Sequence, residues 1–311
     1  MILCVTPNPA IDRTLYVNSL RLGEVHRADK TLVVAGGKGL NVARTIRALG
    51  GEPFCMGLIG GHTGDLFSDL AKQEGLSAQW TQTKNETRTC VIFVEAGRDA
   101  TVVNERGAEV TAEDCENFLR DVWTQAEKAQ LICVSGSLPP GFSIDNFRLL
   151  LSGLTERKKS VWLDTSGAAL ETALGVRGVN IKVNAAELGE ALWSEISNVD
   201  LAIVAGRKLL AQGISSIAIT LGKDGAVLIV DSGVWTAHPP AIEVVSTVGS
   251  GDAFLGGLAF ALDLGNTPET ALRYGVAAGA ANAIQFGGGK VNQQEFGRLF
   301  GETAFTPCPH I

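Results

Sequence analysis

The segment 245–257 joins a glycine-rich turn to an acidic residue and an apolar helical pattern. In this segment, Gly249–Gly251 directly precede Asp252. At a helix start, the free N–H groups of Gly249–Gly251 would point outward, where an anion is favoured. The Asp252 carboxylate has two interpretations. It caps the helix, or it accepts the proton of an attacking hydroxyl while the amides hold a transferring phosphoryl group.

A second glycine turn, between a strand pattern and a helix pattern, carries Lys38 and Asn41. Three interpretations are open: a plain strand-to-helix turn, a dinucleotide fingerprint, or a sugar or phosphate site that uses Lys38 and Asn41. The spacing Gly37-x-Gly39 begins a dinucleotide fingerprint. However, Val42 occupies the position of its third glycine and is too bulky for the close helix packing of that motif. The sugar or phosphate interpretation therefore ranks above the dinucleotide one.

A third pair of polar residues lies where a strand pattern ends and a helix pattern begins. Asn184 and Glu187 are three residues apart, so their side chains share one helical face. They lie at the carboxyl end of a predicted parallel strand, where ligands of α/β proteins gather. The pair is typical of a capping box. It also suits a hydrated Mg²⁺ that one carboxylate and one amide hold through water.

The elements that must position these residues alternate between short apolar runs and longer helical patterns. This alternation predicts βαβ units, and hence a three-layer α/β/α domain with a mostly parallel sheet. The expected strands are 2–5, 131–134, 161–163, 179–183 and 217–221. The expected helices are 39–49, 63–74, 112–126, 144–157, 198–212, 251–264 and 268–285. Because no linker composition interrupts the alternation, residues 1–311 are expected to form a single domain.

Two segments depart from this alternation, 11–34 and 88–104. Their residues alternate in polarity like the strands of a half-exposed sheet, and Gly97-Arg98-Asp99 is typical of a hairpin turn. We expect them to form one small β-sheet lid. A further hairpin is expected to join 217–221 with 226–230 and to turn at Asp224-Gly225. A tight turn alone would account for Gly222 and Gly225 in this segment.

Composition and charge exclude several classes of protein. The net charge is −7 at pH 7, and no cluster of Lys and Arg with interleaved aromatics occurs, which argues against a nucleic-acid partner. The longest uncharged stretches, 129–144 and 274–289, fall short of the ~20 apolar residues of a membrane span. The N-terminus resembles a buried strand and not a secretory signal. The six cysteines show no Cys-x-x-Cys spacing and are expected to be reduced core residues of a cytoplasmic protein.

Six motifs in this order and spacing resemble those of the ribokinase-like carbohydrate kinases. The resemblance is greatest to the phosphofructokinase B branch, which contains 1-phosphofructokinase and tagatose-6-phosphate kinase, and it runs from about Thr6 to Gly289. The motifs are Asn8-Pro-Ala-Ile-Asp12, Gly36-Gly-Lys-Gly-Leu-Asn41, Ser135-Gly-Ser-Leu-Pro139, Lys182-Val-Asn184-x-x-Glu187, Leu221-Gly-x-x-Gly225 and Thr247-Val-Gly-Ser-Gly-Asp252.

The resemblance implies transfer of the γ-phosphoryl group of MgATP to a sugar hydroxyl, with a role for each motif. Asp252 would be the catalytic base, and the anion hole would consist of Gly249, Ser250 and Gly251. The expected acceptor-binding residues are Asp12, Gly37, Lys38 and Asn41, with Arg88 on the acceptor's own phosphate. The expected nucleotide contacts are Lys182, Thr220, Gly222, Gly225 and Asn282, while Asn184 and Glu187 would organise Mg²⁺. The Ser137 hydroxyl either contacts the sugar or only shapes its turn.

Two cations, Lys38 and Arg88, distinguish a phosphorylated acceptor from a neutral one. A neutral sugar gains little from them, whereas a phosphate dianion can be gripped by Arg and neutralised by Lys. The sequence therefore predicts a kinase of a phosphorylated ketohexose, with fructose 1-phosphate as the first choice. Alternatives are tagatose 6-phosphate, fructose 6-phosphate and, more distantly, an unphosphorylated sugar or a dinucleotide-dependent oxidoreductase. The lid is expected to be the interface of a homodimer.

Overall fold

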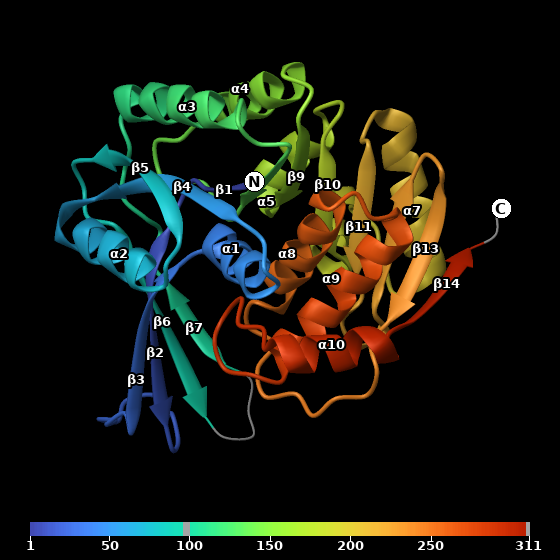
Figure 1. Cartoon of the computed structure of the whole chain (residues 1–311). Helices are drawn as coiled ribbons and strands as arrows, with labels where there is room; N and C mark the ends of the chain where they lie inside the picture. Colours follow the sequence, from blue (N-terminus) through green and yellow to red (C-terminus); the bar gives the residue numbers. More distant parts are fainter. Residues whose placement is uncertain (96–99, 309–311) are drawn as a thin grey trace.

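A ten-stranded sheet with helices on both faces forms the body of the molecule, as the alternation predicted (Figure 1). The computed structural model describes residues 1–95 and 100–308. In spatial order, the described strands are β14 (Ala304–Cys308), β13 (Gly233–His238), β12 (Ala226–Val230), β11 (Ser216–Thr220), β10 (Asn180–Asn184), β9 (Ser160–Asp164), β8 (Leu131–Ser135), β1 (Ile2–Thr6), β4 (Pro53–Gly60) and β5 (Ser77–Thr83).

The strands from β11 to β5 in this order are mutually parallel, whereas β12, β13 and β14 add antiparallel to one edge. The prediction of a mostly parallel sheet is therefore confirmed. The chain runs from β1 to β4 on one side and later returns to β8 on the other. Such a reversal of strand order opens a crevice at the carboxyl ends of the strands, where α/β proteins bind ligands.

The helices cover the two faces of this sheet and create a core on each face. Along β1, Leu3 and Val5 enter one core and Ile2 and Cys4 the other, as the two-residue period of a strand requires. The helices on the first core are α3 (Ala112–Ala126), α4 (Ile144–Glu156), α5 (Gly167–Leu174), α6 (Ala185–Leu192) and α7 (Val199–Gln212). Those on the second are α1 (Lys38–Ala48), α2 (Gly61–Gln73), α8 (Ser250–Asp263) and α9 (Pro268–Ala283).

The predicted lid is a separate four-stranded sheet that stands off the body (Figure 1). Its order is β3 (Lys30–Gly36), β2 (Ala10–Val17), β6 (Arg88–Glu95) and β7 (Thr101–Asn104). Two sequence-distant pieces thus pair, with β2 parallel to β6. The predicted turn Gly97-Arg98-Asp99 lies outside the described residues.

Several short elements were not predicted. They are α5, α10 (Gln293–Glu302), β4, β5, β13 and β14. The strand β14 carries Pro307 and exposed residues, which is tolerated because it lies at the sheet edge. The second predicted hairpin is confirmed, with the short helix η1 (Gly222–Asp224) inside its turn.

The described residues also bear on the predictions drawn from composition. None of their helices is long and apolar enough to cross a membrane. All six cysteines are free, and every one except Cys308 is buried.

Candidate active site

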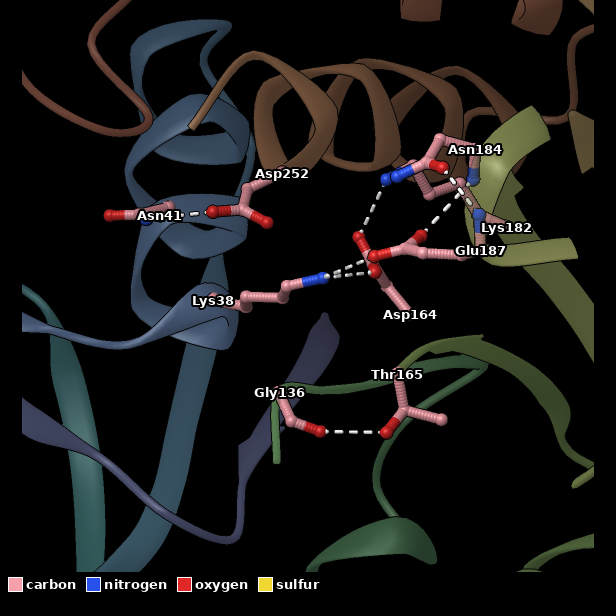
Figure 2. Close-up of polar contacts among 9 residues, drawn as sticks. All are labelled: Lys38, Asn41, Gly136, Asp164, Thr165, Lys182, Asn184, Glu187 and Asp252. Carbon is pink, nitrogen blue, oxygen red and sulfur yellow. Dashed lines mark hydrogen bonds and ion pairs between the residues drawn. The ribbon is translucent and has the colours of Figure 1, made fainter. Parts of the chain in front are cut away.

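Side chains from α1, β9, β10, α6 and α8 meet at the carboxyl edge of the main sheet (Figure 2). Asp164 ends β9, and Lys182 lies in β10 two residues before its end. Lys38 and Asn41 lie in the first turns of α1, while Asp252 lies in the first turn of α8. The structure thus brings together three of the six sequence motifs.

The start of α8 has the geometry of an anion site. Gly249 is its N-cap and has a left-handed φ of 79°. A Cβ on Gly249 would lie 2.4 Å from the Gly288 Cα, so both the backbone angle and the space require glycine here. A Cβ on Gly251 would lie 2.6 Å from the Lys182 Nζ. The ammonium group of Lys182 therefore lies against the helix N-terminus, and both favour an anion.

Asp252 is buried beside this anion site and does not cap the helix. No side-chain cap hydrogen bond is present at Gly249. The Oδ2 atom of Asp252 instead accepts a hydrogen bond of 2.7 Å from the Nδ2 of Asn41 (Figure 2). The carboxylate therefore lies beside the anion site, which is the position that the interpretation as a base requires.

The environment of Asp252 raises its pKa to about 6. Burial is the largest cause, and the nearby Asp164 charge acts in the same direction. The charges of Lys38 and Lys182 and the Asn41 hydrogen bond oppose the rise. A carboxylate with a pKa near the working pH is suited to general-base catalysis.

Asp164 is the site residue that the sequence analysis missed. It has no exposed surface, and it accepts from Lys38 Nζ at 2.7 Å and from Lys182 Nζ at 2.8 Å. Burial alone would raise its pKa, but the two lysines outweigh burial and hold the pKa below its usual range. Its position directly after an apolar strand run, facing the same edge as the motifs, was the available signal.

Lys38 faces this carboxylate and not the lid. Its Nζ lies 4.0 Å from Glu187 Oε1, and it does not line the cavity under the lid. Burial would lower the pKa of Lys38, but Asp164, Asp252 and Glu187 raise it. Three carboxylates therefore attract the Lys38 ammonium toward the strand ends, and its contact with the acceptor's phosphate stays a prediction.

Asn184 and Glu187 form the predicted capping box. The Glu187 amide donates to Asn184 Oδ1 at 2.8 Å, and the Asn184 amide donates to Glu187 Oε2 at 3.2 Å. Glu187 keeps Oε1 on the side of Lys38. Since both side chains are only partly buried and their oxygens retain lone pairs, the donor set also fits a cation held through water.

A cavity between the lid and the body contains the predicted acceptor residues Asp12 and Asn41. A Cβ on Gly36 would overlap the Asp12 carboxyl group at 2.1 Å, so this glycine lets the carboxylate lie against the backbone of the turn. Burial raises the pKa of Asp12 to about 6, against the lowering effects of Arg44, Arg88 and the Gly37 amide.

Arg88 begins the lid strand β6 and is held by main-chain carbonyls. It donates to Asn8 O at 2.9 Å, to Glu105 O at 2.9 Å and to Pro9 O at 3.4 Å. A guanidinium group has five N–H donors, so donors remain for a further acceptor. The exposed Ser137 lies on the same side, where its Oγ accepts from the Asn8 Nδ2 at 3.0 Å.

The predicted nucleotide residues behave differently from one another. Thr220 ends β11 and is half-buried, and Gly222 has open space around its Cα. Gly225 is required by packing, since a Cβ there would lie 2.0 Å from Ala237 O. Asn282 has no exposed surface, and its expected contact with nucleotide stays a prediction.

The Asn282 side chain forms hydrogen bonds with the loops around the anion site. Its Nδ2 donates to Val248 O at 2.9 Å and to Ser250 Oγ at 3.2 Å, and its Oδ1 accepts from the Lys290 amide at 3.1 Å. The side chain therefore acts on the shape of the glycine turn.

Known proteins match this chain along nearly its whole length. The 1-phosphofructokinase of Escherichia coli (strain K12) is 31% identical over 303 residues, which cover 97% of each chain. The structure of phosphofructokinase-2 from E. coli in complex with potassium matches with a TM-score of 0.89 and 26% identity, covering 97% of this chain and 98% of that one. A tetrameric inhibited form of phosphofructokinase-2 from E. coli matches with a TM-score of 0.88, 25% identity and the same coverage.

A family model described as pfkB family carbohydrate kinase matches residues 4–295. This match spans all six motifs and confirms the resemblance on which the predicted fold and chemistry were based. It leaves the dinucleotide alternative without support, in agreement with Val42, which is fully buried in α1. This chain therefore belongs to the PfkB family of carbohydrate kinases.

Proposed function

We propose that this protein transfers the γ-phosphoryl group of MgATP to a hydroxyl of fructose 1-phosphate, giving fructose 1,6-bisphosphate. The similarity to the E. coli 1-phosphofructokinase over 97% of both chains supports this acceptor. Tagatose 6-phosphate and fructose 6-phosphate are the alternatives within the same reaction. We also propose a cytoplasmic location, which the six free cysteines support, because thiols stay reduced there.

The observation that carries the chemistry is the buried Asp252 beside the N-terminus of α8. Asp252 would take the proton of the acceptor hydroxyl, and a pKa of about 6 leaves it ionised at neutral pH. The amides of Gly249–Gly251 and the ammonium of Lys182 would bind the oxygens of the phosphoryl group. Asp12 and Asn41 would bind and orient the acceptor under the lid.

The direct experiment is a coupled ADP-release assay over phosphorylated and free ketohexoses. We expect the highest kcat/KM for fructose 1-phosphate. Equal or greater efficiency with free fructose or ribose would overturn the phosphosugar assignment. Turnover of a nicotinamide cofactor without ADP release would overturn the kinase assignment as well.

Magnesium would be held through water by Asn184 and Glu187, and bound Mg²⁺ neutralises phosphate charge. Replacing Glu187 by Gln is therefore expected to raise the Mg²⁺ concentration for half-maximal activity while the KM for the acceptor stays the same. Magnesium titration at saturating ATP measures this. If the variant only melts at a lower temperature and keeps the wild-type Mg²⁺ dependence, Glu187 acts through its capping box alone.

Arg88 remains the candidate for the acceptor's own phosphate, because part of its N–H set is unused and its charge acts on Asp12. Arg88→Ala is expected to raise the KM for fructose 1-phosphate by about 10²-fold, as loss of a charge-assisted hydrogen bond implies. The KM for ATP should change little. Steady-state kinetics with each substrate varied in turn measures the two KM values separately. An equal rise in the KM for fructose 1-phosphate and the KM for ATP would mean that Arg88 only holds the loops at Asn8 and Glu105.

We further propose that the protein forms a homodimer through the lid. Apolar side chains are exposed on this sheet and its connecting loop, among them Leu22, Val25, Val102 and Val103. A small sheet with an exposed apolar face gains stability when a second copy covers it. Sedimentation velocity at micromolar concentration is expected to show a dimer, and Val103→Lys is expected to shift it toward the monomer. A wild-type monomer under these conditions refutes the proposal.

A further inference from the structure

A continuous chain of polar contacts runs from the end of α2 to the proposed base. Glu74 accepts from Arg44, with its Oε1 2.9 Å from Arg44 Nη2 and its Oε2 in contact with Nε. Arg44 Nη1 donates to Asn41 Oδ1 at 2.7 Å. Asn41 Nδ2 in turn donates to Asp252 Oδ2 at 2.7 Å. Arg44 takes no part in the function proposed above.

The two ends of this chain fix the orientation of the Asn41 amide. A guanidinium group can only donate, and an ionised carboxylate can only accept. With Arg44 on one side and Asp252 on the other, the oxygen of Asn41 must face Arg44 and its NH₂ must face Asp252. The reversed amide would place two donors together on one side and two acceptors together on the other, inside a buried site.

Arg44 is itself held firmly in this position. Its side chain is 9% exposed, and besides Glu74 and Asn41 it contacts the carbonyl oxygen of Ala35. Glu74 follows directly after α2, so Arg44 of α1 links the end of α2 to Ala35 in the lid strand β3. Three acceptors from separate segments therefore leave the guanidinium one orientation.

We propose that Arg44 is a positioning residue, which locks the Asn41 amide so that its NH₂ stabilises the ionised form of Asp252. The proposal rests on Asp252 acting as the base of the proposed kinase reaction. The charged groups that face Asp252 are Lys38 of α1, Asp164 of β9 and Lys182 of β10. The groups that face Arg44 are Glu74 and Asp12.

This arrangement predicts how the pKa of Asp252 responds to the removal of Arg44. The Asn41 hydrogen bond lowers the pKa of Asp252. Removing Arg44 should therefore raise the pKa of Asp252, because the Asn41 amide is then free to turn its oxygen toward the carboxylate. If Arg44 contributed only to the stability of the fold, its removal would not shift the pKa of Asp252 in this way.

The test is the pH titration of the Asn41 side-chain amide by ¹⁵N NMR, assigned by its loss in Asn41→Asp. In wild type, we expect the signals to titrate with Asp252 near pH 6. In Arg44→Met, the midpoint should rise by about one pH unit, and Arg44→Lys, which keeps one donor, should restore part of it. Arg47→Met, an exposed arginine on the same helix, should leave the midpoint unchanged.

The acid limb of the kcat profile should move with the NMR midpoint. An unchanged midpoint in Arg44→Met, or a kcat that falls equally at every pH, overturns the positioning role. If Arg44→Met does not fold, Glu74→Gln takes its place, with a smaller upward shift expected and an unchanged midpoint again contrary to the proposal. Failure of the proposed function is seen separately, because wild type would then release no ADP while the NMR titration still reports on the amide.

Discussion

Asp252→Asn is expected to lower kcat by about 10²–10⁴-fold, the range that positioned proton transfer contributes. The substitution keeps the shape of the side chain and leaves an oxygen that can accept from Asn41 Nδ2. It removes the one group at this position that can take a proton from the acceptor hydroxyl. The amides at the start of α8 and the Lys182 ammonium stay in place, so the affinity for ATP should change little.

A measurement of thermal stability distinguishes this loss of kcat from unfolding of the variant. Because the folded-state pKa of Asp252 is raised to about 6, its contribution to stability is present at low pH and is lost as the pH rises through 6. Asn at this position carries no buried charge, so the variant should melt no lower than wild type at pH 8. Asp263→Asn, at the far end of the same helix, is the matched control and should keep near-native kcat. Near-native turnover in Asp252→Asn would contradict the role of base.

The pH dependence of wild type provides a further check on the same carboxylate. The kcat should rise with pH and reach half its maximum near 6, because Asp252 must be ionised to accept a proton. Asp12 also has a pKa of about 6, but it acts in acceptor binding, so its titration should be seen in kcat/KM. An acid limb near pH 4 in kcat would mean that a more exposed carboxylate is the base.

Local sequence patterns were sufficient for the fold class, the lid and the glycine turn that precedes Asp252. The apolar composition of residues 2–5 is enough to predict a buried strand. The glycine turn before Asp252 predicts the start of a helix within a few residues of its observed position. In both cases the residues that determine the structure are neighbours in the chain. The order of the six motifs then supported a family resemblance over nearly the whole length of the chain.

The contacts that tune the site join residues far apart in sequence, and no local pattern reveals them. Lys38 and Asp164 are separated by 126 positions, and Asn41 and Asp252 by 211. Asp164 follows an ordinary buried strand, so its type and spacing are those of any strand end. The hydrogen bonds of Asn282 to the glycine turn were not predictable for a related reason, since an amide in a helix pattern gives no sign of its burial.

Asp164→Asn is expected to destabilise the fold by about 3–5 kcal/mol, which is the cost of breaking a buried ion pair by removal of one partner. Asp164 has no exposed surface, and the Lys182 side chain is only 4% exposed, so the buried ammonium would lose its ion-pair partner. Lys38, which is 35% exposed, can turn partly to solvent. Urea unfolding at pH 7 measures the difference. Asp145→Asn, which removes an exposed pair with Arg148, is the control and should cost less than about 0.5 kcal/mol.

The same substitution should move the titration of Asp252 in the direction opposite to Arg44→Met. Asp164 raises the pKa of Asp252 by like-charge repulsion, and it also occupies both lysines that would lower this pKa. Without the Asp164 charge, Lys38 and Lys182 act on Asp252 alone, so the acid limb of kcat should shift below pH 6. Residual activity at lower pH combined with reduced stability is therefore the expected signature. A stable variant with an unchanged acid limb would mean that Asp164 neither compensates the two lysines nor acts on the base.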